Sequence, residues 1–195
     1  MRGKKGGVEK TTSAYKEWEV VCEALARGKQ HVLLRKGGIH EGRRGFSFKH
    51  ERFYLFPTRF HAQGEQVREL FGDACRGGMD EWKAGDEIVI RWWCQAMWAR
   101  TLSDWKDVAS LEPFHIWKED LVRERFDCGE VQRIHCALVR VFALPEPLKL
   151  TFEKRYGGCR TWVGLPFDSP DEVVAVVPDD DFTEVQARVE NIFQR

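Results

Sequence analysis

Short apolar stretches typical of β-strands recur along this chain, and the segments between them follow no regular pattern. In residues 87–93, Ile88, Ile90 and Trp92 fall on one face, which is the period-two pattern of a strand. A doubly wound parallel sheet needs strands and helices in regular alternation, and the sequence lacks that alternation. It therefore predicts an α+β fold, with a mixed, strongly bent β-sheet or a small β-barrel and peripheral helices. The other expected strands are residues 31–35, 52–56 closed by Pro57, 95–102, 134–144 and, after the break at Pro145–Pro147, 148–152.

Four segments have the pattern of helices. Residues 14–27 follow Ser13, a favoured N-cap, and carry Tyr15, Trp18, Cys22 and Leu25 at three- and four-residue spacing. The other expected helices are residues 63–75, 117–126 and 181–193. Because 195 residues suit one domain, we expect a disordered basic tail over 1–12 and a single domain over 13–195 that ends in an acidic helix.

The cysteines and the apolar runs indicate where the protein works. The six cysteines form no CxxC pair and stand at no zinc-like spacing from a histidine pair. The first residues are polar and basic, unlike a secretory leader, and no run approaches the roughly 18 apolar residues that cross a bilayer. We therefore expect free thiols in a cytoplasmic protein with no membrane partner, no metal and no cofactor.

Charge is unevenly distributed in a chain whose net charge is zero. Residues 27–61 hold nine Lys or Arg against two acids, or +7, whereas residues 166–195 hold eight acids against two Arg, or −6. Such a chain can attract a polyanion at one place without binding polyanions everywhere.

A glycine-rich basic loop is the strongest candidate site. Residues 35–45 read RKGGIHEGRRG; their glycines let the main chain approach a ligand, and successive N–H groups can form an anion-binding nest. The loop lacks the GxxxxGK[ST] pattern of a nucleotide-hydrolysing P-loop. The alternative is a solvated loop whose bases pair with the acidic tail. The residues expected to contact nucleic-acid phosphates are Arg35, Lys36, Arg43, Arg44, Lys49, His50 and Arg52.

Two further groups of residues are candidates for a pocket. Residues 156–162, YGGCRTW, place Arg160 as an anion clamp beside Tyr156 and Trp162 as stacking platforms; the alternative is a structural turn with Trp162 in the core. His61 and His115 each stand among apolar residues and would serve as acid and base if they converged. A buried structural role is the alternative for each histidine.

Several separated motifs resemble the domain-of-unknown-function family 1802. They are AYKEWEVVCEAL, LLRKGGIHEGRRGF, FYLFPTRFH, PFHIW, LVRVFAL and YGGCRTW, and they span about residues 14–165. The resemblance implies an association with restriction or defence systems and with a separate nuclease. In layout, EALARGKQHVLLRKG, GDEIVI and LVRVFALPEPLKL are also similar to PUA-like barrels of the ASCH and EVE type. Those barrels commonly bind RNA or modified bases.

The sequence is compatible with three functions of different class. The preferred one is a DNA- or RNA-binding module, a sensor or adaptor rather than an enzyme, because no nuclease pattern is present: Glu51-Arg52-Phe53 lacks the required lysine. The alternative is an enzyme for a small nucleobase-like or phosphorylated substrate, with Arg160, His61 and His115 in one cleft. A protein–protein adaptor is a third possibility.

Overall fold

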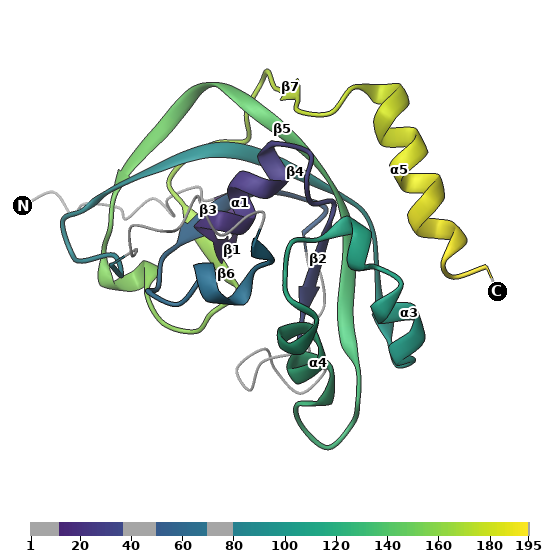
Figure 1. Ribbon diagram of the computed structural model, residues 1–195. Coiled ribbons are helices and arrows are strands. Elements are labelled where there is room, and N and C mark those ends of the chain that lie inside the picture. Colours follow the sequence, from purple (N-terminus) through teal and green to yellow (C-terminus); the bar gives the residue numbers. More distant parts are fainter. Residues whose placement is uncertain (1–11, 37–49, 70–79, 195) are drawn as a thin grey trace, which may run out of the picture.

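The computed structural model describes residues 12–36, 50–69 and 80–194 (Figure 1). The predicted tail over 1–12 lies almost wholly outside the described residues. In chain order the elements are β1 (Thr12–Trp18), α1 (Glu19–Ala26), β2 (Val32–Arg35), β3 (Arg52–Thr58), η1 (Gly64–Gln66), β4 (Glu87–Leu102), α3 (Trp105–Ala109), η3 (Glu112–Phe114), α4 (Glu119–Asp127), β5 (Ile134–Thr151), η4 (Lys154–Tyr156), β6 (Trp162–Leu165), β7 (Val174–Ala175) and α5 (Asp179–Asn191).

Within the described residues, seven strands form one mixed sheet. The order is β2-β5-β4-β3-β1-β6, and β7 pairs with β5 beside this path. The β1–β3 pair is parallel, and the other pairs are antiparallel. The described path runs from β2 to β6 without closing on itself. The predicted α+β class with a mixed, bent sheet is confirmed.

Two long strands give the sheet its bend. β4 and β5 pair along most of their lengths and sweep over the molecule as curved ribbons (Figure 1). Their pairing shifts between Ile90 and Trp92, where residues 144–147 of β5 stand opposite Arg91 alone. The prediction of two short strands in each of these regions is wrong, because bulges let one strand turn without ending. Pro145 and Pro147 lie in the bulged section, where the ladder does not need their missing N–H groups.

The first part of the chain differs from its predicted form. Residues 12–18 are strand β1, and only Glu19–Ala26 is helical. β1 pairs with β3 on one side and β6 on the other, so tertiary pairing overrides the local helical spacing. The predicted helix over 63–75 is wrong in its first residues, because η1 is a single 3-10 turn and Val67 then bridges to Trp117; Glu69 is its one described α-helical residue.

β1 and β3 lie between two cores. Tyr15 and Phe53 belong to a larger core that also packs under α1, α4 and α5, whereas Ala14 and Tyr54 belong to a smaller core on the other face. Burial on both faces explains why β3 is apolar almost throughout. The predicted strand 31–35 and helices 117–126 and 181–193 are confirmed as β2, α4 and α5, with boundaries shifted by one to two residues.

Candidate nucleic-acid interface

A cleft of about 480 Å³ opens beside the ends of β1 and β3, within the size range of ligand pockets. Residues from β1, β2, β3 and the segment 152–160 form its walls. Glu81 is the one acid among its described lining residues. The cationic lining residues are Lys16, Arg35, Arg59 and Arg160, and the aromatic ones are Trp18, Phe56, Phe60, Trp82, Phe152 and Tyr156.

Lys16 is the deepest cation of this cleft. Strand alternation turns Lys16 and Trp18 toward the cleft, whereas Tyr15 belongs to the larger core; Trp18 also packs against the edge of that core. The Lys16 side chain is only 7% exposed, and its Nζ donates to the Gly158 carbonyl at 2.7 Å. Gly158 has a φ of +73°, a backbone conformation that favours glycine, so the YGG sequence lets the turn present this carbonyl.

Cations converge on Lys16. Burial lowers the Lys16 pKa; the Arg160 and Arg35 guanidinium groups lower it further, and Cys159 opposes the shift. One N–H of Arg35 donates to the Lys16 carbonyl at 2.9 Å. The Lys16 amide donates to the Thr161 carbonyl at 2.9 Å and so fixes the turn that carries Arg160. An anion placed here would be attracted by all three cations.

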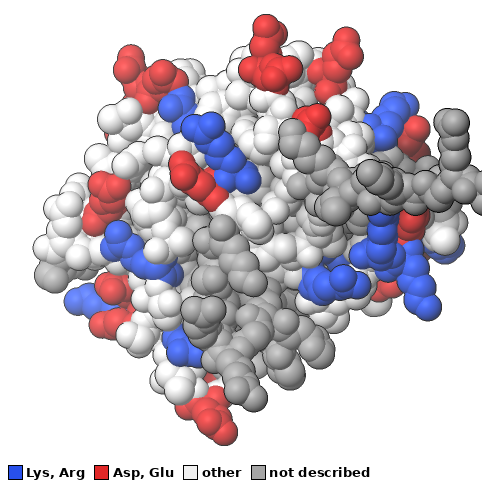
Figure 2. Space-filling model, turned by 180° about the vertical axis from the view of Figure 1, so that it is seen from behind, with Lys and Arg blue, Asp and Glu red and all other residues white. Residues whose placement is uncertain are grey.

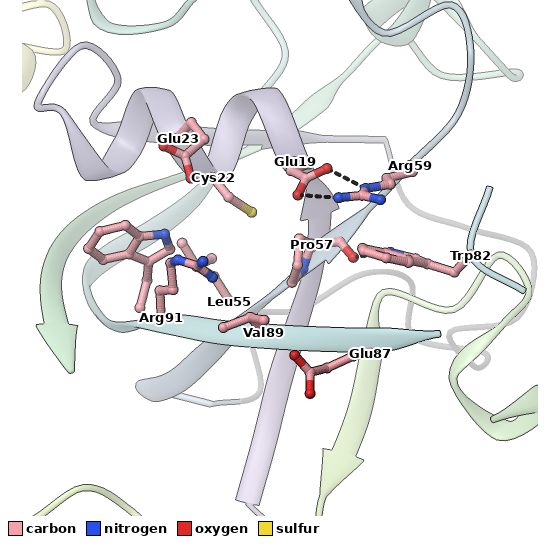
Figure 3. A pocket seen from close by; sticks show the side chains of 11 residues that line it. Glu19, Cys22, Glu23, Leu55, Pro57, Arg59, Trp82, Glu87, Val89 and Arg91 are labelled. Carbon is pink, nitrogen blue, oxygen red and sulfur yellow. Dashed lines mark hydrogen bonds and ion pairs between the residues drawn. The ribbon is translucent and has the colours of Figure 1, made fainter. Parts of the chain in front are cut away.

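Arg59 and Trp82 form the wall at the other end of the cleft. The Arg59 guanidinium lies 3.7 Å from the centre of the Trp82 ring and donates to both Glu19 oxygens, at 2.5 and 3.1 Å (Figure 3). Trp82 in turn donates from Nε1 to the Pro57 carbonyl at 2.9 Å. Beyond this wall lies a smaller hollow of about 200 Å³ between α1 and β4, which Glu23 and Glu87 also line. Arg59 is therefore partly neutralised by Glu19.

The structure describes only part of the predicted basic loop. Arg43, Arg44 and Lys49 lie outside the described residues. Arg35 lines the cleft, whereas Lys36 points elsewhere: its Nζ donates to the Phe126, Val131 and Arg133 carbonyls at 3.2, 2.9 and 3.1 Å. The three ammonium hydrogens of Lys36 are thus engaged by the end of α4 and the following turn. A phosphate contact would have to displace them.

The Lys36→Met variant should lower the free energy of unfolding by about 1–3 kcal/mol, because charged hydrogen bonds to three carbonyls are lost. Urea denaturation measures the change. Lys29→Met removes an exposed lysine and should change it by less than about 0.5 kcal/mol. An equally small effect at Lys36 would contradict a structural role for its ammonium.

The remaining predicted residues divide between the cleft and the core. Tyr156 is 2% exposed, lines the cleft and packs on Phe56 with ring centres 5.6 Å apart. Trp162 packs edge-on against Tyr15 and Phe53 at 5.1 Å each, as the structural alternative expected. His50 packs on Trp162, and its Nε2 lies 3.1 Å from Ser13 Oγ. Arg52 is exposed at the start of β3.

The two predicted pocket histidines lie apart from Arg160. His61 is exposed beside Phe60, whereas His115 is 2% exposed and lines a separate hollow of about 110 Å³ with Glu112 and Glu119. Neither is among the described residues that line the cleft. The described cleft therefore lacks the acid–base pair that the enzymatic alternative requires.

Sequence reasoning missed Lys16, Trp18, Arg59 and Trp82. The sequence could have indicated Lys16, because a lysine between Tyr15 and Glu17 in an apolar strand needs polar partners for its ammonium group. Assigning this region to a helix hid that signal.

Surface charge elsewhere is mixed. On the face in Figure 2, described Lys and Arg side chains lie among Asp and Glu side chains. The five described cysteines are free thiols, and in the described ranges no three His, Cys, Asp or Glu side chains converge as metal ligands would. No helix in the described part of the chain is long and apolar enough to span a membrane.

The motifs that form the cleft are spread over most of the chain, and a family model covers the same span. The model described as "Domain of unknown function (DUF1802)" matches residues 14–188. The chain belongs to the DUF1802 family. The resemblance in the sequence motifs is thereby confirmed for this DUF1802 protein. No curated protein matches it.

Similar solved structures are ASCH proteins. The crystal structure of ASCH from Zymomonas mobilis has a TM-score of 0.44 at 10% identity and covers 90% of this DUF1802 chain and 93% of its own. A serine-to-alanine mutant of that protein has a TM-score of 0.42 at 9% identity, covering 90% and 94% of the two chains. A tyrosine-to-phenylalanine mutant has 0.41 at 10% identity, covering 90% and 96%.

Proposed function

We propose that this protein binds nucleic acid and holds one nucleotide of a single strand in the cleft between β1, β3 and residues 152–160. The observation that carries the proposal is the joining of cationic and aromatic side chains in one cleft of about 480 Å³. Phosphate contacts supply most nucleic-acid affinity, and aromatic rings accept any base face.

The side chains that line the cleft suit both parts of a nucleotide. Lys16, Arg35 and Arg160 provide positive charge for the phosphate. Trp18 and Phe60, whose ring centres lie 4.9 Å apart, provide apolar rings for the base. Each base that stacks on such a ring contributes about 1–3 kcal/mol. Because a duplex keeps its bases stacked on one another, the cleft favours a single strand or an unpaired end.

The predicted basic loop belongs to the same proposal. Gly37 follows Arg35 and Lys36 directly in the sequence, so the loop starts beside the cleft. Its arginines, Arg43 and Arg44, would contact phosphates of the strand outside the cleft. The association with a separate nuclease rests on the sequence resemblance alone, and no feature of the described residues bears on it.

The paired variant Lys16→Met with Arg160→Ala tests the proposal. Polarisation of labelled single- and double-stranded DNA and RNA measures affinity across salt concentrations. We expect the single-strand affinity to fall at least about 10-fold and the log–log salt slope to become shallower by about 1.4, because two phosphate contacts are lost.

The matched control is Lys29→Met with Arg133→Ala, which removes the same charges from exposed side chains outside the cleft. It should keep both affinity and slope close to those of the parent. If the cleft variant folds and binds like the parent, or if the control loses as much, the cleft is not the binding site. Absence of binding to every strand at low salt would overturn the proposal altogether.

A further inference from the structure

The charge at the end of the cleft identifies a ligand class, and this step rests on the proposed function. We infer that the cleft holds a phosphate monoester, either the terminal phosphate of a strand or that of a mononucleotide, in preference to an internal phosphodiester.

The first step is the position of Lys16. Lys16 is only 7% exposed, and one of its three ammonium hydrogens is donated, to the Gly158 carbonyl. No described carboxylate lies within ion-pair distance of it. A buried charge is costly unless a counter-charge or further hydrogen bonds compensate for it. The Lys16 ammonium therefore has hydrogen-bonding capacity and charge left for an anion in the cleft.

The second step is the number of cations. Arg160 and Arg35 line the same cleft as Lys16, and an N–H of Arg35 reaches the Lys16 carbonyl at 2.9 Å. A phosphate monoester carries about −1.5 to −2 charges at pH 7 and three terminal oxygens, whereas a diester carries one charge and two such oxygens. Two planar guanidinium groups and one ammonium group in the same cleft suit the monoester better than the diester.

The third step is access. Lys16 is the least exposed of the cations that line the cleft, and the 2.7 Å hydrogen bond joins its ammonium to the turn at Gly157 and Gly158. An internal diester must have chain leaving it in two directions. A terminal phosphate has one, so it can reach the Lys16 ammonium while its nucleoside stays among the aromatic side chains.

The same arrangement couples the ligand to a proton. Burial, and less strongly the Arg160 and Arg35 cations, disfavours the charge on Lys16 and lowers its pKa, whereas a bound dianion would favour that charge. Ligand binding should thus raise the Lys16 pKa, and binding should weaken as pH rises past the lowered pKa of the free protein.

Four forms of one single-stranded oligonucleotide provide the test: a 5′-phosphate, a 3′-phosphate, both ends hydroxyl, and a closed circle without ends. Adenosine 5′-monophosphate and adenosine serve as competitors. We expect one phosphorylated end to bind at least about 10-fold more tightly than the hydroxyl form and the circle. The better end identifies the source, and the monophosphate should compete where adenosine does not.

Lys16→Met should abolish the preference for the phosphorylated end, and Arg133→Ala should retain it. Should Lys16→Met fail to fold by circular dichroism, Arg160→Ala at the exposed rim replaces it. Equal affinity for all four forms, together with a loss of affinity in the cleft variants, would overturn the monoester inference and leave the proposed function standing. Absence of binding to any form would overturn both.

Discussion

Replacing Arg125 with methionine should lower the free energy of unfolding by about 3 kcal/mol, among the largest effects expected of any single substitution here. The Arg125 guanidinium lies between two indole rings, 4.9 Å from the centre of Trp18 and 5.0 Å from that of Trp117. It also donates to the Leu34 carbonyl at 3.4 Å. Burial lowers the Arg125 pKa, and the Glu17 carboxylate opposes that shift most strongly.

Glu17 is the other half of this arrangement. Its side chain is 1% exposed; Oε1 accepts from the Trp18 amide at 2.8 Å, and Oε2 is buried without a hydrogen bond. In Arg125→Met the carboxylate would lose its compensating charge, which is why the cost exceeds that of two ring contacts. Glu17→Gln should cost about 2 kcal/mol, because the buried guanidinium would lose the carboxylate that most strongly favours its charge.

A double-mutant cycle distinguishes this coupling from two independent losses. The variant Glu17→Gln with Arg125→Met should be more stable, by at least about 1 kcal/mol, than the sum of the single effects predicts. Arg123→Met, on the same helix but half-exposed and paired with Asp127, should cost less than about 1 kcal/mol. Additive effects in urea denaturation would mean that Glu17 and Arg125 do not stabilise one another.

This charge pair also bears on the cleft. Glu17 stands between Lys16 and Trp18 in β1, and Leu34 precedes Arg35 in β2. Arg125, which stacks on Trp18 of β1 and donates to the Leu34 carbonyl of β2, therefore links the two strands beside Lys16 and Arg35, which line the cleft. Stability and the shape of the binding site depend here on the same contacts.

The misassignment of β1 explains much of what sequence reasoning missed. Tyr15, Trp18, Cys22 and Leu25 keep helical spacing, yet the first two lie in a strand. What decides is pairing with β3, in which Tyr54 lies opposite Ala14 although it comes forty positions later in the sequence. The spacing of apolar residues within one segment carries no information about pairing with a distant strand, so it predicts one helix over residues 14–27.

The sequence predicted several residues of the cleft, but not that they lie together. Arg35, Arg160 and Tyr156 were each singled out, but as members of two separate groups more than a hundred residues apart. The bend of the sheet brings them together: β2 stands at the opposite end of the strand order from β1 and β6, yet Lys16 contacts both Arg35 and the Gly158 turn. Arg35 and Arg160 each stand in a glycine-rich motif that singled them out, whereas Lys16 attracts notice only once residues 12–18 are recognised as a strand.

Acid should destabilise this protein through His115, and the His115→Phe variant should resist that effect. His115 is buried, and burial first, then the Arg68 and Arg125 cations, lowers its pKa to about 3, although a backbone hydrogen bond at Trp117 opposes the shift. In the unfolded chain the pKa is about 6.5. Between these values the unfolded state binds the extra proton, so stability falls as pH falls through the window.

The slope sets the size of the effect. One such group contributes up to about 1.4 kcal/mol per pH unit, so lowering the pH from about 6.5 to about 4.5 should cost roughly 2–3 kcal/mol. Glu112 and Glu119 line the hollow beside His115. His31 adds a contribution of the same sign, because burial lowers its pKa as well. Only the difference in slope between variants therefore isolates His115.

Urea denaturation at several pH values, for the parent, His115→Phe and His61→Asn, measures that difference. The exposed His61 is the control, and its variant should lose stability in acid as steeply as the parent does. His115→Phe removes the titrating group from the hollow. Between about pH 6.5 and about pH 4.5 its free energy of unfolding should therefore fall by roughly 2–3 kcal/mol less than that of the parent. A nuclear magnetic resonance titration of the His115 ring gives an independent measurement: protonation in the folded protein near pH 6.5 would mean that water reaches this ring and that its surroundings tolerate the charge.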